Sequence, residues 1–204
     1  MNQEVVREDL LIVGLGNPES DYADTRHNLG FACVREVGKR LGIQVDRKRW
    51  QSLIGHSEAK GIWLVLPQTY MNLSGQPVAK AVRDLNLTPS RVWVVHDELD
   101  LPLCRVRLRR GGSGAGHNGV LSVISSLGTE DFVRFRVGIG KPARKGSPAG
   151  RSYVLGRFTK VEAGRIPTIV DGVATALELA IEAGLERAME KYNRPGALGC
   201  EELK

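Results

Sequence analysis

The stretch Leu10-Leu-Ile-Val-Gly-Leu15 is a short apolar run closed by turn residues, which predicts a buried β-strand. Asn17 follows it at the start of a polar loop that extends to Gly30. The residues over 31–41 then place apolar side chains at helical spacing, and Gly42 ends the pattern. The chain therefore opens with a strand, a polar loop and a helix, which is the repeating unit of an α/β fold.

The same alternation continues along the chain. We expect further strands at 61–66, 92–95, 105–110 and 132–139, and helices at 77–85, 120–127 and 173–188. This order predicts an α/β fold with a twisted mixed sheet, largely parallel, and helices on both faces. The 204 residues show no long linker and no internal repeat, so we expect one domain over 1–192 and a flexible C-terminal tail over 193–204.

The composition excludes several protein classes. Hydrophobic residues make up 42% and charged residues 25% of the chain, which is typical of a folded globular protein and not of a disordered, collagen-like or coiled-coil one. No apolar run approaches the ~20 residues that span a bilayer, so we expect no membrane association. The polar N-terminal residues resemble neither a secretory signal nor a transit peptide, and we expect a cytoplasmic protein.

The three cysteines show no metal-site or disulfide pattern. Cys33, Cys104 and Cys200 are scattered and have no CxxC spacing. This spacing predicts neither a zinc site nor a disulfide framework, and it fits reduced thiols in a cytosol.

Positive charge is concentrated in the middle of the chain. The net charge is +6, and arginines alternate with apolar residues over 105–110. Nearly all ionisable residues over 134–165 are also positive, whereas glutamates spaced by four over 178–190 predict one acidic row on the last helix. A polyanion such as nucleic acid would bind the basic middle, although each charged run could also be a simply solvated face.

Two glycine-rich stretches only partly match known ligand-binding motifs. The residues after the first strand begin like a dinucleotide fingerprint, but Glu19 stands where the third glycine is needed and would repel a pyrophosphate. The loop over 111–116 lacks the ending of a P-loop, and Ala115 replaces a glycine of the nucleophile elbow, so Ser113 is a poor nucleophile candidate. We therefore expect no nucleotide cofactor.

The stretch His96-Asp-Glu-Leu-Asp100 could suggest a metal site. In an extended chain, Asp97 and Leu99 point to one side and the other three residues to the opposite side. These five side chains cannot converge simply on one ion, and no second histidine cluster is nearby, so we expect no metal.

Polar residues gather instead at strand ends and in the loops that follow strands. These residues are Asn17, Tyr22, His27, Asn28, Asn72, Asp97, His117 and Asn118. In an open α/β sheet these loops meet at the carboxyl edge, where ligands bind. A histidine and an aspartate there supply a base and the group that orients it, and asparagine amides can polarise a carbonyl group without adding charge.

Ordered motifs match a known family. They are Gly16-Asn-Pro18, Tyr22-x-x-Thr-Arg-His-Asn-x-Gly30, Thr69-Tyr-Met-Asn-Leu-Ser-Gly75, His96-Asp-Glu-Leu-Asp-Leu-Pro102, His117-Asn-Gly119 and Arg136-x-Gly-Ile-Gly140. The chain closely resembles bacterial-type peptidyl-tRNA hydrolases over roughly residues 9 to 192. The resemblance implies a monomeric α/β enzyme without a cofactor. It would hydrolyse the ester between peptide and tRNA and so recycle the tRNA of prematurely released peptidyl-tRNA.

The resemblance also implies roles for individual residues. His27 would be the general base that activates water, Asp97 its partner, and Asn17 and Asn72 would line the catalytic site. The substrate-binding residues would be Tyr22, Met71, Asn72, His117 and Asn118. The tRNA phosphates would contact Arg105, Arg107, Arg109 and Arg136, of which the first three should share one strand face.

The chain departs from the family pattern at two helix positions. Arg35 stands where the family usually has an acid, and Leu121 stands where it usually has a basic residue. Both departures concern contacts with tRNA and not the reacting groups. Two alternative functions remain open at this point: a non-catalytic RNA-binding scaffold of the same fold, similar to plastid splicing factors, and an aminoacyl-tRNA deacylase.

Overall fold

The computed structural model describes residues 9–141 and 150–202. Its seven strands form one sheet in the order β2-β3-β4-β1-β5-β7-β6. The strands are β1 (Leu10–Gly14), β2 (Arg47–Arg49), β3 (Ser52–Ser57), β4 (Ile62–Pro67), β5 (Val92–Glu98), β6 (Val106–Arg110) and β7 (Val133–Gly138). The four central strands are parallel, whereas β2, β3 and β6 join antiparallel to their neighbours. This arrangement confirms the predicted mixed α/β sheet.

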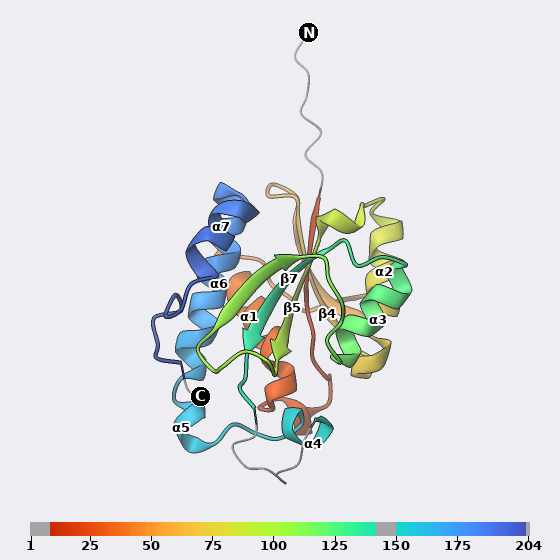
Figure 1. Cartoon of the computed structure of the whole chain (residues 1–204). Coiled ribbons are helices and arrows are strands. Elements are labelled where there is room, and N and C mark those ends of the chain that lie inside the picture. Colours follow the sequence, from red (N-terminus) through yellow and green to blue (C-terminus); the bar gives the residue numbers. More distant parts are fainter. Residues whose placement is uncertain (1–8, 142–149, 203–204) are drawn as a thin grey trace.

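Helices cover both faces of the sheet. They are α1 (Leu29–Leu41), α2 (Gly75–Asp84), α3 (Asn118–Leu127), α4 (Arg151–Val154), α5 (Lys160–Ala163), α6 (Ile166–Ala183) and α7 (Leu185–Tyr192). Helices α2 and α3 lie on one face, and α1 and α6 lie on the other (Figure 1). Because both faces are covered, alternate residues of a central strand enter two cores, and the strand is apolar throughout.

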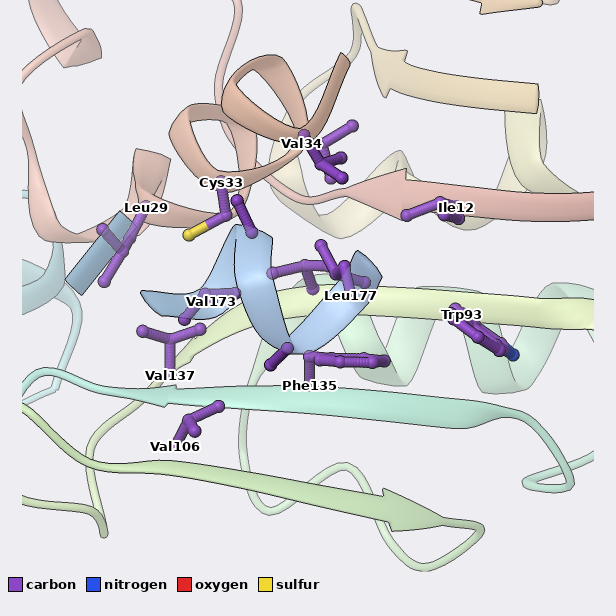
Figure 2. Packing of buried hydrophobic residues seen from close by; sticks show 14 of the residues in the cluster. Ile12, Leu29, Cys33, Val34, Trp93, Val106, Phe135, Val137, Val173 and Leu177 are labelled. Atoms are coloured by element: carbon purple, nitrogen blue, oxygen red, sulfur yellow. The ribbon is translucent and has the colours of Figure 1, made fainter. Parts of the chain in front are cut away.

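The core on the α1–α6 side is the larger of the two. Val173 and Leu177 of α6 lie over Phe135 of β7, with Cys33 of α1 beside them (Figure 2). On the other face, residues such as Val13 and Val94 pack beneath α2 and α3. None of the helices within 9–141 and 150–202 is long and apolar enough to cross a membrane.

The C-terminal helix differs from the expectation. The sequence predicts one helix with a single row of four glutamates, but Gly184 adopts φ +91° and separates α6 from α7. Glu178 and Glu182 therefore belong to one helix, and Glu186 and Glu190 belong to the next. Glycine populates positive φ at little cost, and apolar spacing alone did not reveal the break.

The residues that follow α7 pack on the protein body. The Asn193 side chain accepts a hydrogen bond from the Leu108 N–H at 2.7 Å and donates one to the Leu108 carbonyl at 3.0 Å. Leu198 is buried against α6, where it lies close to Gly172. Residues of this segment therefore contact the folded body, which the sequence alone did not indicate.

A disulfide fixes this segment to the turn before β6. Cys104 and Cys200 are bonded, which corrects the expectation of reduced thiols for this pair. The two residues are 96 positions apart, and spacing in sequence gives no measure of their distance in the fold. Cys33 is the free and buried cysteine, and burial raises the pKa of its thiol far above the usual range, which makes it unreactive.

Candidate active site

A cleft of about 690 Å³ lies where the parallel strands end. The loop after β1 contributes Asn17, the turn after β4 contributes Met71 and Asn72, and Asp97 lies near the end of β5. The cleft wall includes every residue that the sequence analysis proposed for catalysis or substrate binding. These are Asn17, Tyr22, His27, Met71, Asn72, Asp97, His117 and Asn118.

Two histidines bind one buried carboxylate in this cleft. His27 Nδ1 lies 2.9 Å from Asp97 Oδ1 and 3.1 Å from Oδ2, and His117 Nε2 lies 2.9 Å from the same Oδ1. His117 Nδ1 accepts hydrogen bonds from the backbone N–H groups of Gly119 and Val120, so the Nε2–H must donate to Asp97. His27 likewise donates its Nδ1–H to Asp97, which leaves Nε2 unprotonated and able to act as a base.

The Asp97 carboxylate is held in its ionised form. Burial by itself would raise its pKa, but the neighbouring His117 and His27 outweigh burial and hold the pKa well below the usual range. An ionised Asp97 fixes the imidazole of His27 by accepting the hydrogen bond of its Nδ1–H, and it stabilises the imidazolium that forms when Nε2 takes a proton.

Asn17 and Asn28 are hydrogen-bonded to each other beside His27, Asp97 and His117, which we call the triad. The Asn17 backbone N–H donates to Asn28 Oδ1 at 2.7 Å, and Asn28 Nδ2 donates to the Asn17 carbonyl at 2.9 Å. The Asn17 side-chain oxygen also accepts the Met71 N–H at 3.2 Å. This oxygen is therefore engaged, and the amide nitrogen of Asn17 is the atom that remains to donate toward a ligand.

The tight approach of α1 to the sheet positions the turn that carries His27. A Cβ on Gly14 would lie 2.5 Å from the Gly30 carbonyl oxygen, and a Cβ on Gly30 would lie 2.4 Å from that of Val95. Neither distance is sterically possible, so both positions require glycine. The close contact brings the short 3-10 turn Arg26–Asn28 against the end of β5, next to Asp97.

The triad is also the one group of potential metal ligands within residues 9–141 and 150–202. The ligand atoms of His27, Asp97 and His117 lie within 4.8 Å of one another. Each imidazole nitrogen that faces Asp97 already donates a hydrogen bond to it, so the three side chains fit a hydrogen-bonded group. A bound cation would have to displace both of these hydrogen bonds.

His96 lies behind the triad and is almost fully buried. Its Nδ1–H donates to the Asp97 carbonyl at 2.7 Å, and its ring contacts that of His117 edge-on. Burial and the neighbouring His117 hold the pKa of His96 well below its usual value, so the ring is neutral. Sequence alternation correctly separated His96 from Asp97, but it did not indicate this supporting contact.

Comparison with known proteins shows the family of the chain. The family model described as peptidyl-tRNA hydrolase matches residues 11–198. The chain belongs to the peptidyl-tRNA hydrolase family. It is 42% identical over 189 residues to the peptidyl-tRNA hydrolase of Mycobacterium tuberculosis strain H37Rv, covering 91% of this chain and 98% of the relative. A relative from Carboxydothermus hydrogenoformans is 44% identical over 188 residues, covering 91% and 99% of the two chains.

The fold agrees with a solved structure of the same family. The crystal structure of peptidyl-tRNA hydrolase from Acinetobacter baumannii superposes with a TM-score of 0.82 at 32% identity, covering 96% of each chain. The identity is high enough for the likeness to reflect family membership as well as fold.

The four arginines proposed for tRNA phosphate have different surroundings in this peptidyl-tRNA hydrolase family member. Arg107 and Arg109 of β6 are exposed and lie opposite Arg136 and Arg134 of β7. Arg107, Arg109 and Arg136 therefore share one sheet face, together with Arg134. Arg136 Nε donates to Glu98 at 2.9 Å.

Arg105 does not share that face, so this expectation is wrong. Its guanidinium pairs with Glu202 at 2.9 Å and donates to the Asn193 carbonyl. Cys104 adopts φ +68°, which turns the chain just before β6 begins and directs Arg105 toward the C-terminal segment.

Proposed function

We propose that this chain hydrolyses the ester that joins a peptide to the terminal ribose of tRNA, with His27 as the general base. The observation that carries the proposal is the hydrogen bonding of His27, whose Nδ1 is bound to buried Asp97 while the ring lines the cleft. Nε2 is then the basic atom available to a water molecule.

The reaction needs no covalent intermediate. His27 Nε2 takes a proton from water, and the oxygen attacks the ester carbonyl to form a tetrahedral intermediate. The C–O bond to the ribose then breaks, His27 returns the proton to the ribose oxygen, and the peptide leaves with a free carboxyl group. The Asn17 and Asn72 amides line the same cleft and are suited to donate to the developing oxyanion.

Asp97 and His117 act as a unit that orients the base. The sequence predicts a substrate-binding role for His117, and its hydrogen bonds add a second role, because its Nε2–H fixes the carboxylate that His27 uses. Asn118, Met71 and Tyr22 line the rest of the cleft, where they are available to the peptide and to the 3′ end of the tRNA.

The exposed arginine face beside the cleft is suited to the tRNA backbone. Arg107 and Arg109 provide cations on β6, and Arg136 lies next to them although Glu98 partly neutralises it. Phosphate contacts of this kind depend on charge and not on base sequence. Arg105 is not part of this surface because it pairs with Glu202. We further propose that the protein acts as a cytoplasmic monomer and recycles the tRNA of prematurely released peptidyl-tRNA.

The decisive experiment compares N-blocked with free aminoacyl-tRNA as substrates. A peptidyl-tRNA hydrolase releases tRNA from N-acetyl-aminoacyl-tRNA and leaves the free aminoacyl form largely intact. A deacylase would cleave the free form, and an RNA-binding scaffold would bind both without cleaving either. The family match and the intact triad favour the first of these outcomes.

A further inference from the structure

Arg26 precedes the catalytic base in the chain but does not line the cleft. Its side chain is buried and turns away from His27 toward residues 153–162, which are far away in the sequence. A buried guanidinium is costly unless its charge and its N–H groups find partners, so its surroundings indicate what it holds in place.

The guanidinium is bound on several sides by one segment. Nη1 donates to the Arg157 carbonyl at 2.7 Å and to the Gly156 carbonyl at 3.2 Å, and Nη2 pairs with Glu162 Oε2 at 2.6 Å. Its carbon Cζ lies 4.2 Å from the centre of the Tyr153 ring. This fork geometry needs arginine, because a lysine ammonium cannot reach two carbonyls and a carboxylate together.

The partner Glu162 is itself fixed. Its Oε2 also accepts the Thr159 backbone N–H at 2.7 Å, while the Thr159 hydroxyl accepts the Glu162 N–H, which forms a capping box at the start of α5. Arg26 therefore bonds to a rigid anchor and not to a mobile surface carboxylate.

The segment that Arg26 holds contributes one wall of the cleft. Gly150, Arg151, Val154 and Leu155, in and beside α4, line it together with His27. Helix α4 lies beyond the ends of the strands, apart from both helix layers (Figure 1). Helix α4 packs on the turn that carries Arg26 and His27, and its Tyr153 hydroxyl donates to the Ile139 carbonyl at 3.0 Å.

We propose that Arg26 is a positioning residue that fixes the α4 wall of the cleft relative to the base His27. The inference rests on the proposed function, since it assumes that a substrate held against this wall must meet Nε2 of His27. Small errors in such alignment are costly, because displacements of about 1 Å can slow a reaction by about 10²-fold.

Arg40 provides a matched control. It is also a partly buried arginine with several acidic partners: it pairs with Glu36 on its own helix and joins α1 to α6 through Asp171 and Glu178. None of these residues lines the cleft. Arg40→Lys therefore removes a comparable network without touching the wall or the base.

The experiment measures Arg26→Lys, Glu162→Gln and Arg40→Lys in the full chain. With N-acetyl-aminoacyl-tRNA as substrate, we expect Arg26→Lys to lower kcat about tenfold and Glu162→Gln about threefold, with KM within about twofold of wild type. The NMR signal of the His27 Cε1–H should shift in both variants. Arg40→Lys should lower only the melting temperature.

Wild-type kcat and an unshifted His27 signal in both Arg26→Lys and Glu162→Gln would overturn the proposal, even if both variants melt earlier. If Arg26→Lys fails to fold, Glu162→Gln alone tests the proposal, because this variant removes the charge of a residue that lies outside the cleft. The NMR signal does not depend on turnover. An inactive wild type would therefore contradict the proposed function, while the signal still tests the positioning role.

Discussion

At the scale of single residues, His117 shows what a sequence motif cannot convey. The stretch His117-Asn-Gly119 indicated a ligand-binding turn, yet the ring of His117 both caps α3 and donates to Asp97. The residue types of the site, and their place after strands, were predictable from the sequence. The hydrogen-bonding direction of each ring was not, because it depends on backbone amides that only the folded turn brings within reach.

His27→Ala should abolish turnover while the protein still folds and binds tRNA. Loss of a general base costs about 10²- to 10⁴-fold in rate, and the small polar turn leaves no large core cavity behind. Single-turnover assays with N-acetyl-aminoacyl-tRNA, together with tRNA binding measured by filter retention, check both parts. Turnover near the wild-type rate would exclude His27 as the base.

His96 should make the protein less stable in mild acid. Burial and the neighbouring His117 lower the pKa of His96 in the folded state. Below about pH 6.5 the unfolded chain therefore binds a proton at this histidine, whereas the folded chain does not. The free energy of unfolding should therefore fall with decreasing pH, by about 1.4 kcal/mol per unit from this group.

Urea titrations at pH 7.5 and pH 5.5 measure this effect. His96→Asn should reduce the difference in the free energy of unfolding between the two pH values. An unchanged difference in His96→Asn would assign the acid sensitivity to other groups.

At the scale of elements, the central strands and the helices α1, α2 and α3 followed from apolar runs and helical spacing. The hairpin of β2 and β3 escaped prediction because β2 consists of three charged residues at the sheet edge. Helix α4 escaped as well, since its four residues are too few to show a helical spacing of apolar side chains.

The arginines of β6 should contribute to tRNA binding through charge. Arg107→Ala combined with Arg109→Ala should raise KM for a tRNA substrate more than it lowers kcat, and the salt dependence of binding should weaken by about one unit of slope per lost contact. A substrate consisting of only a 3′-terminal nucleotide ester should be nearly unaffected.

The matched control removes the same charge from the opposite edge of the sheet. Arg47→Ala combined with Lys48→Ala, both on exposed β2, should leave KM and the salt slope unchanged. If the two double variants behave alike, general charge and not the β6 face attracts the tRNA.

At the scale of the whole molecule, the order of elements predicted the fold class. It did not predict that the C-terminal residues pack on the rest of the fold. The C-terminal residues that looked like a loose tail contribute Leu198 to the core and Asn193 to the edge of β6. Their sequence is rich in small and polar residues, and only contact with an existing surface gives them order.

The Cys104–Cys200 disulfide should stabilise the fold measurably. It closes a loop of 96 positions, for which loss of chain entropy in the unfolded state predicts a contribution of about 4.7 kcal/mol. Cys200→Ser should lower the urea midpoint under oxidising conditions. Reductant should bring wild type down to the level of Cys200→Ser and leave the variant unchanged. If reductant leaves the urea midpoint of wild type unchanged, the disulfide does not contribute to stability.

The sheet order has a consequence for how copies of this chain meet one another. Both edges of the sheet carry a row of exposed cations: Arg47, Lys48 and Arg49 on β2, and Arg107, Arg109 and Arg110 on β6. A strand from another copy that tried to extend the sheet would bring like charges together, and on β6 it would also have to displace Asn193 from Leu108. The β6 arginines that we propose for tRNA phosphate would thus have a second effect, since the cations on both edges oppose aggregation through the sheet edges.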